Sequence, residues 1–137
     1  MTRPTDVPNP HEPASFSEML GTSEMETGEG WARVRMPIGP RHLQAAGNVQ
    51  GGIIMTLADM AITRALSTLS QGNGTSVTVE LKINFIAPAR QGELIAEGRI
   101  THKGGTLSVG EVAVTDADGK LIATGMGTWM VLQPRPR

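Results

Sequence analysis

The sequence predicts an α+β fold in which an antiparallel β-sheet wraps around one long helix. Three features indicate this fold: an apolar helical segment at residues 51–70, four long β-type runs after it, and short glycine-containing turns between those runs. Short turns between successive strands favour antiparallel hairpins. With 137 residues, the chain is long enough for one domain with a core and too short for two comfortable ones.

Residues 1–15 are expected to form a flexible N-terminal arm. They contain four prolines and lack the apolar run of a signal peptide. The single domain is then expected at residues 16–133, followed by a short tail at 134–137. Its first element is expected to be one short helical turn formed by Phe16, Met19 and Leu20. Two short strands follow, at about 24–27 and 31–36, separated by a GEG turn. In the second strand the residues that offer apolar contacts are Trp31, Val34 and Met36.

The segment from Gly51 to Ser70 predicts a buried helix, because its apolar residues recur at three and four and only Asp59 and Arg64 are charged. Such a helix must be covered on most of its circumference, as by a curved sheet. The segment also has the length of a membrane span, but its two charges would be costly in lipid. We therefore expect a soluble, cytoplasmic protein with no membrane partner.

The turn QGNG at 71–74 ends the helix, and four long strands are predicted after it. Glycine tolerates the left-handed conformation that often follows a helix. The connections APARQG, GG and ADG are turn sequences, and the strands between them are expected at 76–87, 93–103, 106–116 and 120–132.

Composition and motifs exclude several classes of function. Twelve Lys and Arg balance thirteen Asp and Glu without a basic tract, so we expect no nucleic-acid partner. No cysteine is present, which excludes disulfides and thiolate chemistry. The sequence has no GxSxG elbow, P-loop or dinucleotide fingerprint. His11, His42 and His102 lack metal-ligand spacing and are expected at the surface, and DADGK at 116–120 is read as a hairpin turn, so no metal site is predicted.

Asp59 is the main candidate for chemistry, because aspartate is a poor interior helix residue and its charge is expensive to bury. On a regular helix its face is mostly apolar, with Thr56 and Thr63 as the nearest polar side chains. A carboxylate in an apolar cleft is a candidate functional group. The alternative is a structural role, as an ion pair with Arg64 or within a buried network.

Gly51 and Gly52 begin the same helix. Unpaired N–H groups at a helix N-terminus form a site for an oxyanion, and the absent side chains leave these groups open. A pair of glycines alone is a weak signal that more often marks a turn or close backbone packing.

Taken together, Gly51-Gly52, Asp59 and the following SVTVELKINFIAPA resemble the hotdog-fold acyl-CoA thioesterases of the phenylacetate-degradation (PaaI-like) type, over roughly residues 41–132. The resemblance implies a curved antiparallel sheet around one long helix, and association into dimers or dimers of dimers. It also implies hydrolysis of an aryl- or medium-chain acyl-CoA to the free acid and coenzyme A. Coenzyme A is then part of the substrate, and no cofactor is expected.

The resemblance also assigns roles to individual residues. Asp59 takes the position of the catalytic nucleophile or general base, and Gly51 of the other protomer takes that of the backbone donor to the thioester carbonyl. The family usually has HGG where this chain has Gln50-Gly51-Gly52, so a glutamine amide replaces an imidazole. The remaining carried-over positions are Thr63 beside the aspartate, Thr78 near the acyl group, Gln44 assisting substrate or water, and Gln50 and Gly52 in substrate binding.

Two other functions are weighed against the thioesterase. The missing histidine suggests a non-catalytic module that binds acyl-CoA or acyl-carrier protein. A hotdog hydratase or dehydratase would need a histidine at the cleft, and no histidine lies on the central helix. Arg41, Arg90 and Lys103 are candidates for contacts to the coenzyme A phosphates, with ordinary surface charge as the alternative.

Overall fold

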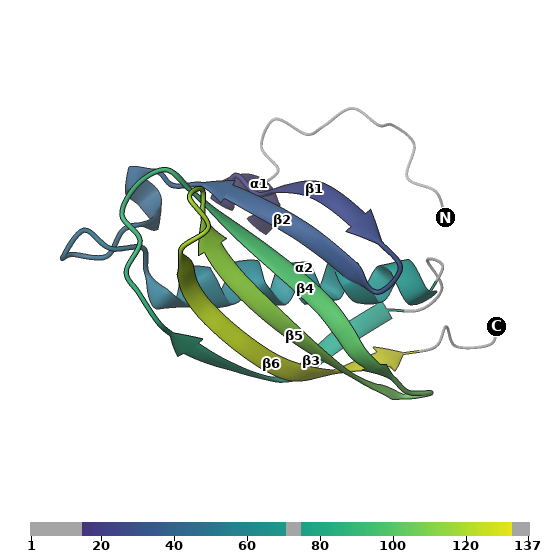
Figure 1. The fold of residues 1–137 in the computed structure, drawn as a ribbon. Helices are drawn as coiled ribbons and strands as arrows, with labels where there is room; N and C mark the ends of the chain where they lie inside the picture. Colours follow the sequence, from purple (N-terminus) through teal and green to yellow (C-terminus); the bar gives the residue numbers. More distant parts are fainter. Residues whose placement is uncertain (1–14, 71–74, 133–137) are drawn as a thin grey trace, which may run out of the picture.

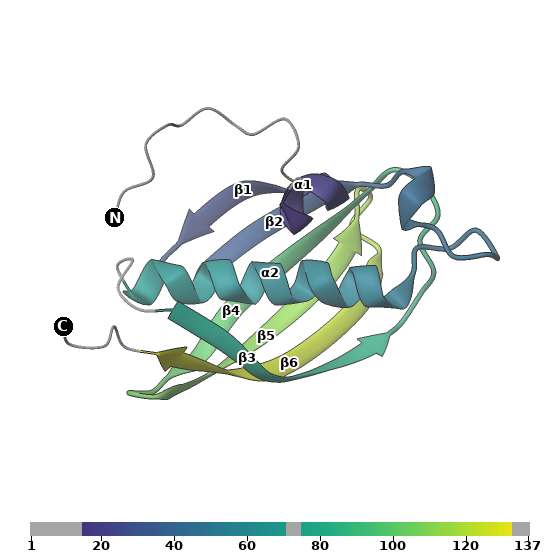
Figure 2. The same cartoon turned by 180° about the vertical axis from the view of Figure 1, so that it is seen from behind.

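The long helix α2 (Gly51–Ser70) lies against the inner side of a six-stranded antiparallel sheet with the strand order β1-β2-β4-β5-β6-β3. The computed structural model describes residues 15–70 and 75–132. Figures 1 and 2 show the sheet from its outer side and from the helix side. The other elements are α1 (Phe16–Leu20), β1 (Ser23–Gly28), β2 (Trp31–Pro37), the 3-10 turn η1 (Pro40–His42), β3 (Thr75–Phe85), β4 (Glu93–Lys103), β5 (Leu107–Asp116) and β6 (Leu121–Leu132).

The predicted fold is confirmed: one long helix is wrapped by an antiparallel sheet, and each predicted strand is present within about two residues of its expected ends. The helical turn at α1 and the hairpin turn at 116–120 are present as well; in the hairpin Asp116 Oδ1 accepts from the N–H groups of Asp118 and Lys120, both at 2.9 Å. The arm up to residue 14, the turn 71–74, the tail 134–137 and His11 lie outside the described residues.

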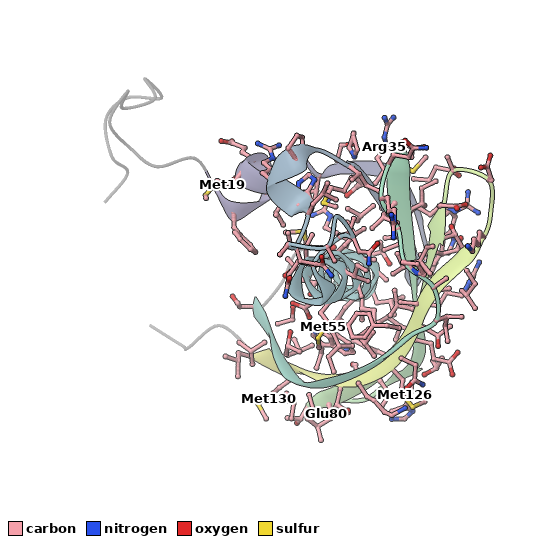
Figure 3. All side chains as sticks on the ribbon, turned by 90° about the vertical axis from the view of Figure 1, so that its left-hand side faces the viewer. Met19, Arg35, Met55, Glu80, Met126 and Met130 are labelled. Atoms are coloured by element: carbon pink, nitrogen blue, oxygen red, sulfur yellow. The ribbon has the colours of Figure 1, made fainter. Side chains whose placement is uncertain are left out.

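One face of α2 forms the centre of the core. Its buried residues recur at three and four, as an amphipathic helix on a sheet requires, and they are Ile54, Leu57, Ala58, Ala61, Ile62, Ala65 and Leu66. The helix packs mainly on β2 and β4. Gly98 of β4 permits this close approach, because a Cβ there would lie 2.7 Å from the backbone of Ala61 and Ile62. Figure 3, viewed along α2, shows the sheet curling around the helix and leaving one side of it uncovered.

By length and composition alone, α2 is apolar enough to cross a membrane. The buried core helix of a protein outside the membrane can have the same length and apolar composition. Here α2 contacts five strands of the sheet, which accounts for its apolar composition.

Strand β2 packs one of its two faces on the helix. Ala32, Val34 and Met36 are buried against α2, but Trp31 lies on the opposite face, because successive side chains of a strand alternate between faces. On that outer face the guanidinium groups of Arg33 and Arg99 each lie 5.8 Å from the Trp31 ring centroid. Trp31 therefore contributes to a surface cluster and not to the core.

His42 was expected at the surface, but this prediction was wrong, because the residue is only 1% exposed. Its Nδ1 accepts from the N–H of Gly39 at 2.9 Å, and its Nε2 lies 2.8 Å from the carbonyl oxygen of Leu20, to which it donates. The ring thus ties η1 to the end of α1. His102 is exposed, as expected.

Candidate active site

Asp59 lies half-buried in the middle of α2, and two donors converge on one of its oxygens. Thr78 Oγ1 donates to Asp59 Oδ1 at 2.7 Å, and Trp129 Nε1 donates to the same oxygen at 3.2 Å. Oδ2 accepts no hydrogen bond within the described part of the chain. One oxygen of the carboxylate is thus held by the sheet, and the other is left available.

The register of the sheet brings the two donors together. Thr78 on β3 and Trp129 on β6 are directly opposite each other in the ladder, so their side chains share one face. A β-bulge follows immediately, with Val79 as the extra residue between Thr78 and Glu80. Because a bulge inserts one residue, Thr78 and Leu81 can both face the helix although three positions separate them.

A cleft of about 460 Å³ opens beside Asp59, between α2 and the segment that joins α1 to β1. Its walls combine apolar and polar side chains: Ser17, Thr22, Ser23, Glu24, Val34, Met60, Thr63 and Arg64 line it together with Asp59. This volume lies within the range of small-molecule sites in proteins. The cleft therefore gives a small molecule access to Asp59.

The surroundings of Asp59 differ from the mostly apolar face expected from the sequence. Ile62 and Leu66 point into the core, whereas Thr56 and Thr63 are part-exposed, as are Met55 and Met60. Thr56 Oγ1 donates to the carbonyl oxygen of Gly52 at 2.9 Å. Arg64 forms no ion pair with Asp59; its Nε donates to Glu24 Oε2 at 2.6 Å. The structural ion pair considered from the sequence is absent.

Gly51 and Gly52 form the N-terminus of α2. The carbonyl oxygen of Gln50 accepts from the N–H groups of Ile53 and Ile54. The N–H groups of Gly51 and Gly52 donate to no protein oxygen in the described ranges, as expected for the first turn of a helix. Gly52 has open space around its Cα, whereas a Cβ on Gly51 would lie 3.2 Å from the Phe85 ring.

The loop before α2 is held by backbone hydrogen bonds. Gln50 N–H donates to the carbonyl oxygen of His42 at 2.8 Å, and Val49 N–H donates to that of Ala89 at 2.8 Å. The side chain of Gln50 is exposed. Gln44 lies in a tight turn, where its side-chain oxygen accepts from the N–H of Ala46.

Gly51 and Asp59 lie too far apart to act on one carbonyl from the same chain. Both are on α2, and eight residues at 1.5 Å each separate them by about 12 Å along the axis. Within one protomer the structure thus brings Asp59 together with Thr78 and a cleft bordered by Thr63, and leaves Gly51, Gly52 and Gln50 at the end of the helix.

Two of the three basic candidates flank the loop that leads to Gly51. Arg41 precedes His42, whose carbonyl oxygen accepts from Gln50 N–H. Arg90 follows Ala89, whose carbonyl oxygen accepts from Val49 N–H. Lys103 lies at the other end of β4, in the hairpin to β5, where its Nζ donates to the Gly104 carbonyl oxygen at 3.1 Å. Arg41 and Arg90 are exposed.

A larger hollow, of about 710 Å³, lies on the outer face of the sheet, on the side away from Asp59. Its charged wall is an ion-paired row: Arg33 Nε lies 2.6 Å from Glu97 Oε2, and Arg99 Nη2 lies 2.9 Å from Glu97 Oε1. The hydrogen bond from Arg33 is the main cause that lowers the pKa of the Glu97 carboxyl. Arg33 also pairs with Glu26, at 3.0 Å, and none of the candidate residues lines this hollow.

Trp129 was not among the residues that the sequence singled out. The side chains of β6 alternate between the two faces of the sheet, which indicates the residues that face the core. The contact between Trp129 and Asp59 could not be predicted in this way, because the two residues are 70 positions apart. A buried tryptophan usually finds a partner for its N–H, and that rule was the only available signal. No three His, Asp or Glu side chains in the described ranges are grouped so as to hold a metal ion.

Comparison with known proteins gives the family. The model of the Thioesterase superfamily matches residues 46–123, more than half of the chain. A Saccharolobus solfataricus protein provisionally named an esterase is 39% identical over 108 residues, which cover 78% of this chain and 76% of that protein. Acyl-coenzyme A thioesterase 13 of Homo sapiens is 32% identical over 117 residues, covering 83% of each chain.

A solved structure agrees with the fold. The E. coli PaaI protein from the phenylacetic acid degradation operon superimposes with a TM-score of 0.79 and 24% identity, covering 85% of this chain and 83% of that one. At this identity the likeness concerns the fold. With the family match and the two relatives, it establishes that this chain belongs to the thioesterase superfamily and is a thioester hydrolase with the hotdog fold.

Proposed function

We propose that this protein hydrolyses an aryl- or medium-chain acyl-CoA thioester to the free acid and coenzyme A, with Asp59 as the nucleophile or general base. The observation that carries the proposal is the state of the Asp59 carboxylate. One oxygen is held by two donors, the other accepts no hydrogen bond from the residues that the structure describes, and Asp59 borders a cleft of about 460 Å³. A carboxylate positioned in this way is suited to attack or to deprotonate a water molecule.

The proposed reaction needs few groups besides the carboxylate. As a base, Asp59 removes a proton from water, and the hydroxide adds to the thioester carbonyl carbon; as a nucleophile, its oxygen adds directly and water then cleaves the anhydride. In both routes negative charge develops on the carbonyl oxygen, where an N–H group at a helix N-terminus stabilises it. Collapse of the intermediate expels coenzyme A as a thiolate, so the reaction uses only water and the substrate.

The oxyanion donor is proposed to come from a second copy of the chain. Gly51 N–H donates to no oxygen of the described residues, but about 12 Å of helix separates Gly51 from Asp59 in one protomer. In a symmetric dimer with antiparallel α2 helices, Gly51 of one protomer can lie near Asp59 of the other. Two sites then form per dimer.

The sheet edge offers a surface for such a dimer. Strand β3 is at the edge of the sheet, and an unpaired edge is a template for pairing with another chain. Large apolar side chains at this edge are about half exposed, from 42% for Val77 to 56% for Ile86, with Val79 and Phe85 between them. Burial of these side chains favours association of two copies, and assembly into a dimer of dimers remains part of the proposal.

The other candidate residues have proposed roles that follow from their positions. Gly52 N–H and the exposed Gln50 side chain lie at the start of α2, where they can contact the substrate near the carbonyl. Thr63 borders the cleft and can orient a water molecule. Thr78 donates a hydrogen bond to Asp59 and is proposed to lie near the acyl group. The side-chain amide nitrogen of Gln44 is proposed to assist the substrate or water.

The coenzyme A phosphates are proposed to lie near Arg90 and Arg41, because these residues flank the loop that ends at Gly51. Lys103 lies at the far end of β4 and is a weaker candidate in the same protomer. The apolar residues Val34 and Met60 are proposed to contact the acyl chain in the cleft. Methionine adapts to many shapes, which suits acyl groups of several kinds.

The test is release of coenzyme A from a panel of short, medium, long and aryl acyl-CoA thioesters, with the wild type and Asp59→Ala measured in parallel. The proposal expects turnover of aryl or medium-chain members by the wild type and none by the variant. Saturable binding of acyl-CoA without hydrolysis would instead support a binding module and contradict the proposal.

A further inference from the structure

Trp129 combines complete burial with a polar contact to the candidate carboxylate. Its side chain is 0% exposed, and its indole N–H donates to Asp59 Oδ1 at 3.2 Å. A buried indole N–H without a partner is costly, and the partner used here is the one carboxylate on α2. The pairing joins β6 to the central helix at the position of the proposed chemistry.

Of the two donors to Oδ1, Trp129 is the one that packing holds rigidly. Thr78 is exposed, and its hydroxyl can turn about a single bond. The indole lies in the core, with Gly127 two residues earlier on the same face; a Cβ on Gly127 would lie 2.8 Å from the ring. Glycine at 127 leaves the space that the ring occupies, and the surrounding core fixes its direction.

We infer that Trp129 is a positioning residue for Asp59: its N–H holds Oδ1 and, together with Thr78, keeps Oδ2 turned toward the substrate. The inference rests on the proposed role of Asp59. Two donors on one oxygen leave the other as the only one able to react, and a carboxylate with a fixed orientation loses less entropy on reaching the transition state.

The kinetic test removes each donor separately. Trp129→Phe keeps an aromatic ring and deletes the N–H, and Thr78→Val keeps the shape and deletes the hydroxyl. Each is expected to lower kcat about 10- to 100-fold, the range for a hydrogen bond to a charged group, with a much smaller effect on KM. Thr78→Ser restores the hydroxyl and is expected to regain most of the rate. Trp31→Phe, on the outer face, is the matched control and is expected to leave kcat unchanged.

A spectroscopic test does not depend on activity. The chain has two tryptophans, so its ¹⁵N-labelled indole N–H groups give two signals, and the spectrum of Trp31→Phe assigns them. In Asp59→Ala the Trp129 signal is expected to move upfield because its acceptor is lost, while the Trp31 signal stays in place. This variant leaves the tryptophan itself and the core around it intact.

The results separate the inference from the proposed function. An unmoved Trp129 signal in Asp59→Ala, or a wild-type kcat in Trp129→Phe, would overturn the positioning role. Full activity in Asp59→Ala with a shifted Trp129 signal would overturn the catalytic role of Asp59, and the positioning role with it, while leaving the hydrogen bond established. If Trp129→Phe fails to fold, the Trp129 indole signal in Asp59→Ala still decides whether the hydrogen bond to Asp59 exists, and an unmoved signal overturns the inference.

Discussion

Gly51 and Asp59 lie on the same helix with about 12 Å of helix axis between them, and each has a polar atom without a hydrogen-bond partner among residues 15–70 and 75–132: the N–H of Gly51 and Oδ2 of Asp59. A thioester needs both groups within a few ångströms of one carbonyl. One chain does not place both groups at one carbonyl, so the proposed mechanism requires two copies for a complete site.

The first prediction concerns the carboxylate. Asp59→Asn keeps the size of the side chain and its ability to accept from Thr78, but removes the charge needed for attack or proton abstraction. We expect kcat to fall by about 10²- to 10⁴-fold, the usual contribution of a positioned acid or base. Steady-state coenzyme A release measures it, and circular dichroism should show an unchanged fold. Comparable rates in the wild type and Asp59→Asn would rule out Asp59 as the base or nucleophile.

The second prediction concerns the oxyanion donor. Gly51→Pro deletes the N–H at the first helical position, where proline is well tolerated. We expect a loss of about 10²- to 10³-fold in kcat, as for other single oxyanion donors. Gly51→Ala is the matched control, because it adds a Cβ near Phe85 but keeps the N–H. Equal losses in the two variants would indicate steric disturbance in place of a lost donor.

The third prediction concerns the buried histidine. His42→Ala leaves the N–H of Gly39 and the carbonyl oxygen of Leu20 without their partner and opens a cavity. We expect the free energy of unfolding to fall by about 2–4 kcal/mol in a urea titration. His102→Ala, at the surface, is the control and should change it by less than about 0.5 kcal/mol. Equal effects would show that the His42 contacts contribute no net stability.

The fourth prediction concerns acid stability. The hydrogen bond from Arg33 lowers the pKa of Glu97 below its usual value of 4.5, so the folded state binds this proton less readily than the unfolded state. The resulting stabilisation is present above about pH 4.5 and is lost as the pH falls further. We therefore expect the stability of the wild type to fall more steeply than that of Glu97→Gln between pH 5 and pH 3, measured by denaturation at each pH. Parallel curves would mean that the pair does not affect acid stability.

The sequence predicted the fold well because its strongest signals are local. The apolar run at 51–70 and the glycine turns between strands each specify an element without reference to distant residues. The face of β2 on which Trp31 lies was not predicted, because apolar character alone does not say which face of a strand a residue occupies. His42 was misplaced because its two partners, Gly39 and Leu20, meet it only after folding.

The candidate site was predictable in part. Asp59 stood out as a charge in an apolar helix. Its contacts did not, because Thr78 and Trp129 reach it through the β3–β6 register and the bulge at Val79, which depend on pairing across the sheet. The side of α2 that stays uncovered also depends on where the sheet ends, and the periodicity of apolar residues does not report that.

The central claim is that Asp59 of one protomer works with Gly51 of another, and heterodimers test it most directly. Two differently tagged chains are co-expressed, and the mixed species is purified. A heterodimer of Asp59→Ala with Gly51→Pro retains one intact shared site, so we predict about half of the wild-type rate, given two equivalent sites per symmetric dimer. A heterodimer of the wild type with a chain carrying both substitutions has no intact shared site and should be nearly inactive. The reverse pattern, with activity only in the second heterodimer, would place the whole site within one chain and contradict the account.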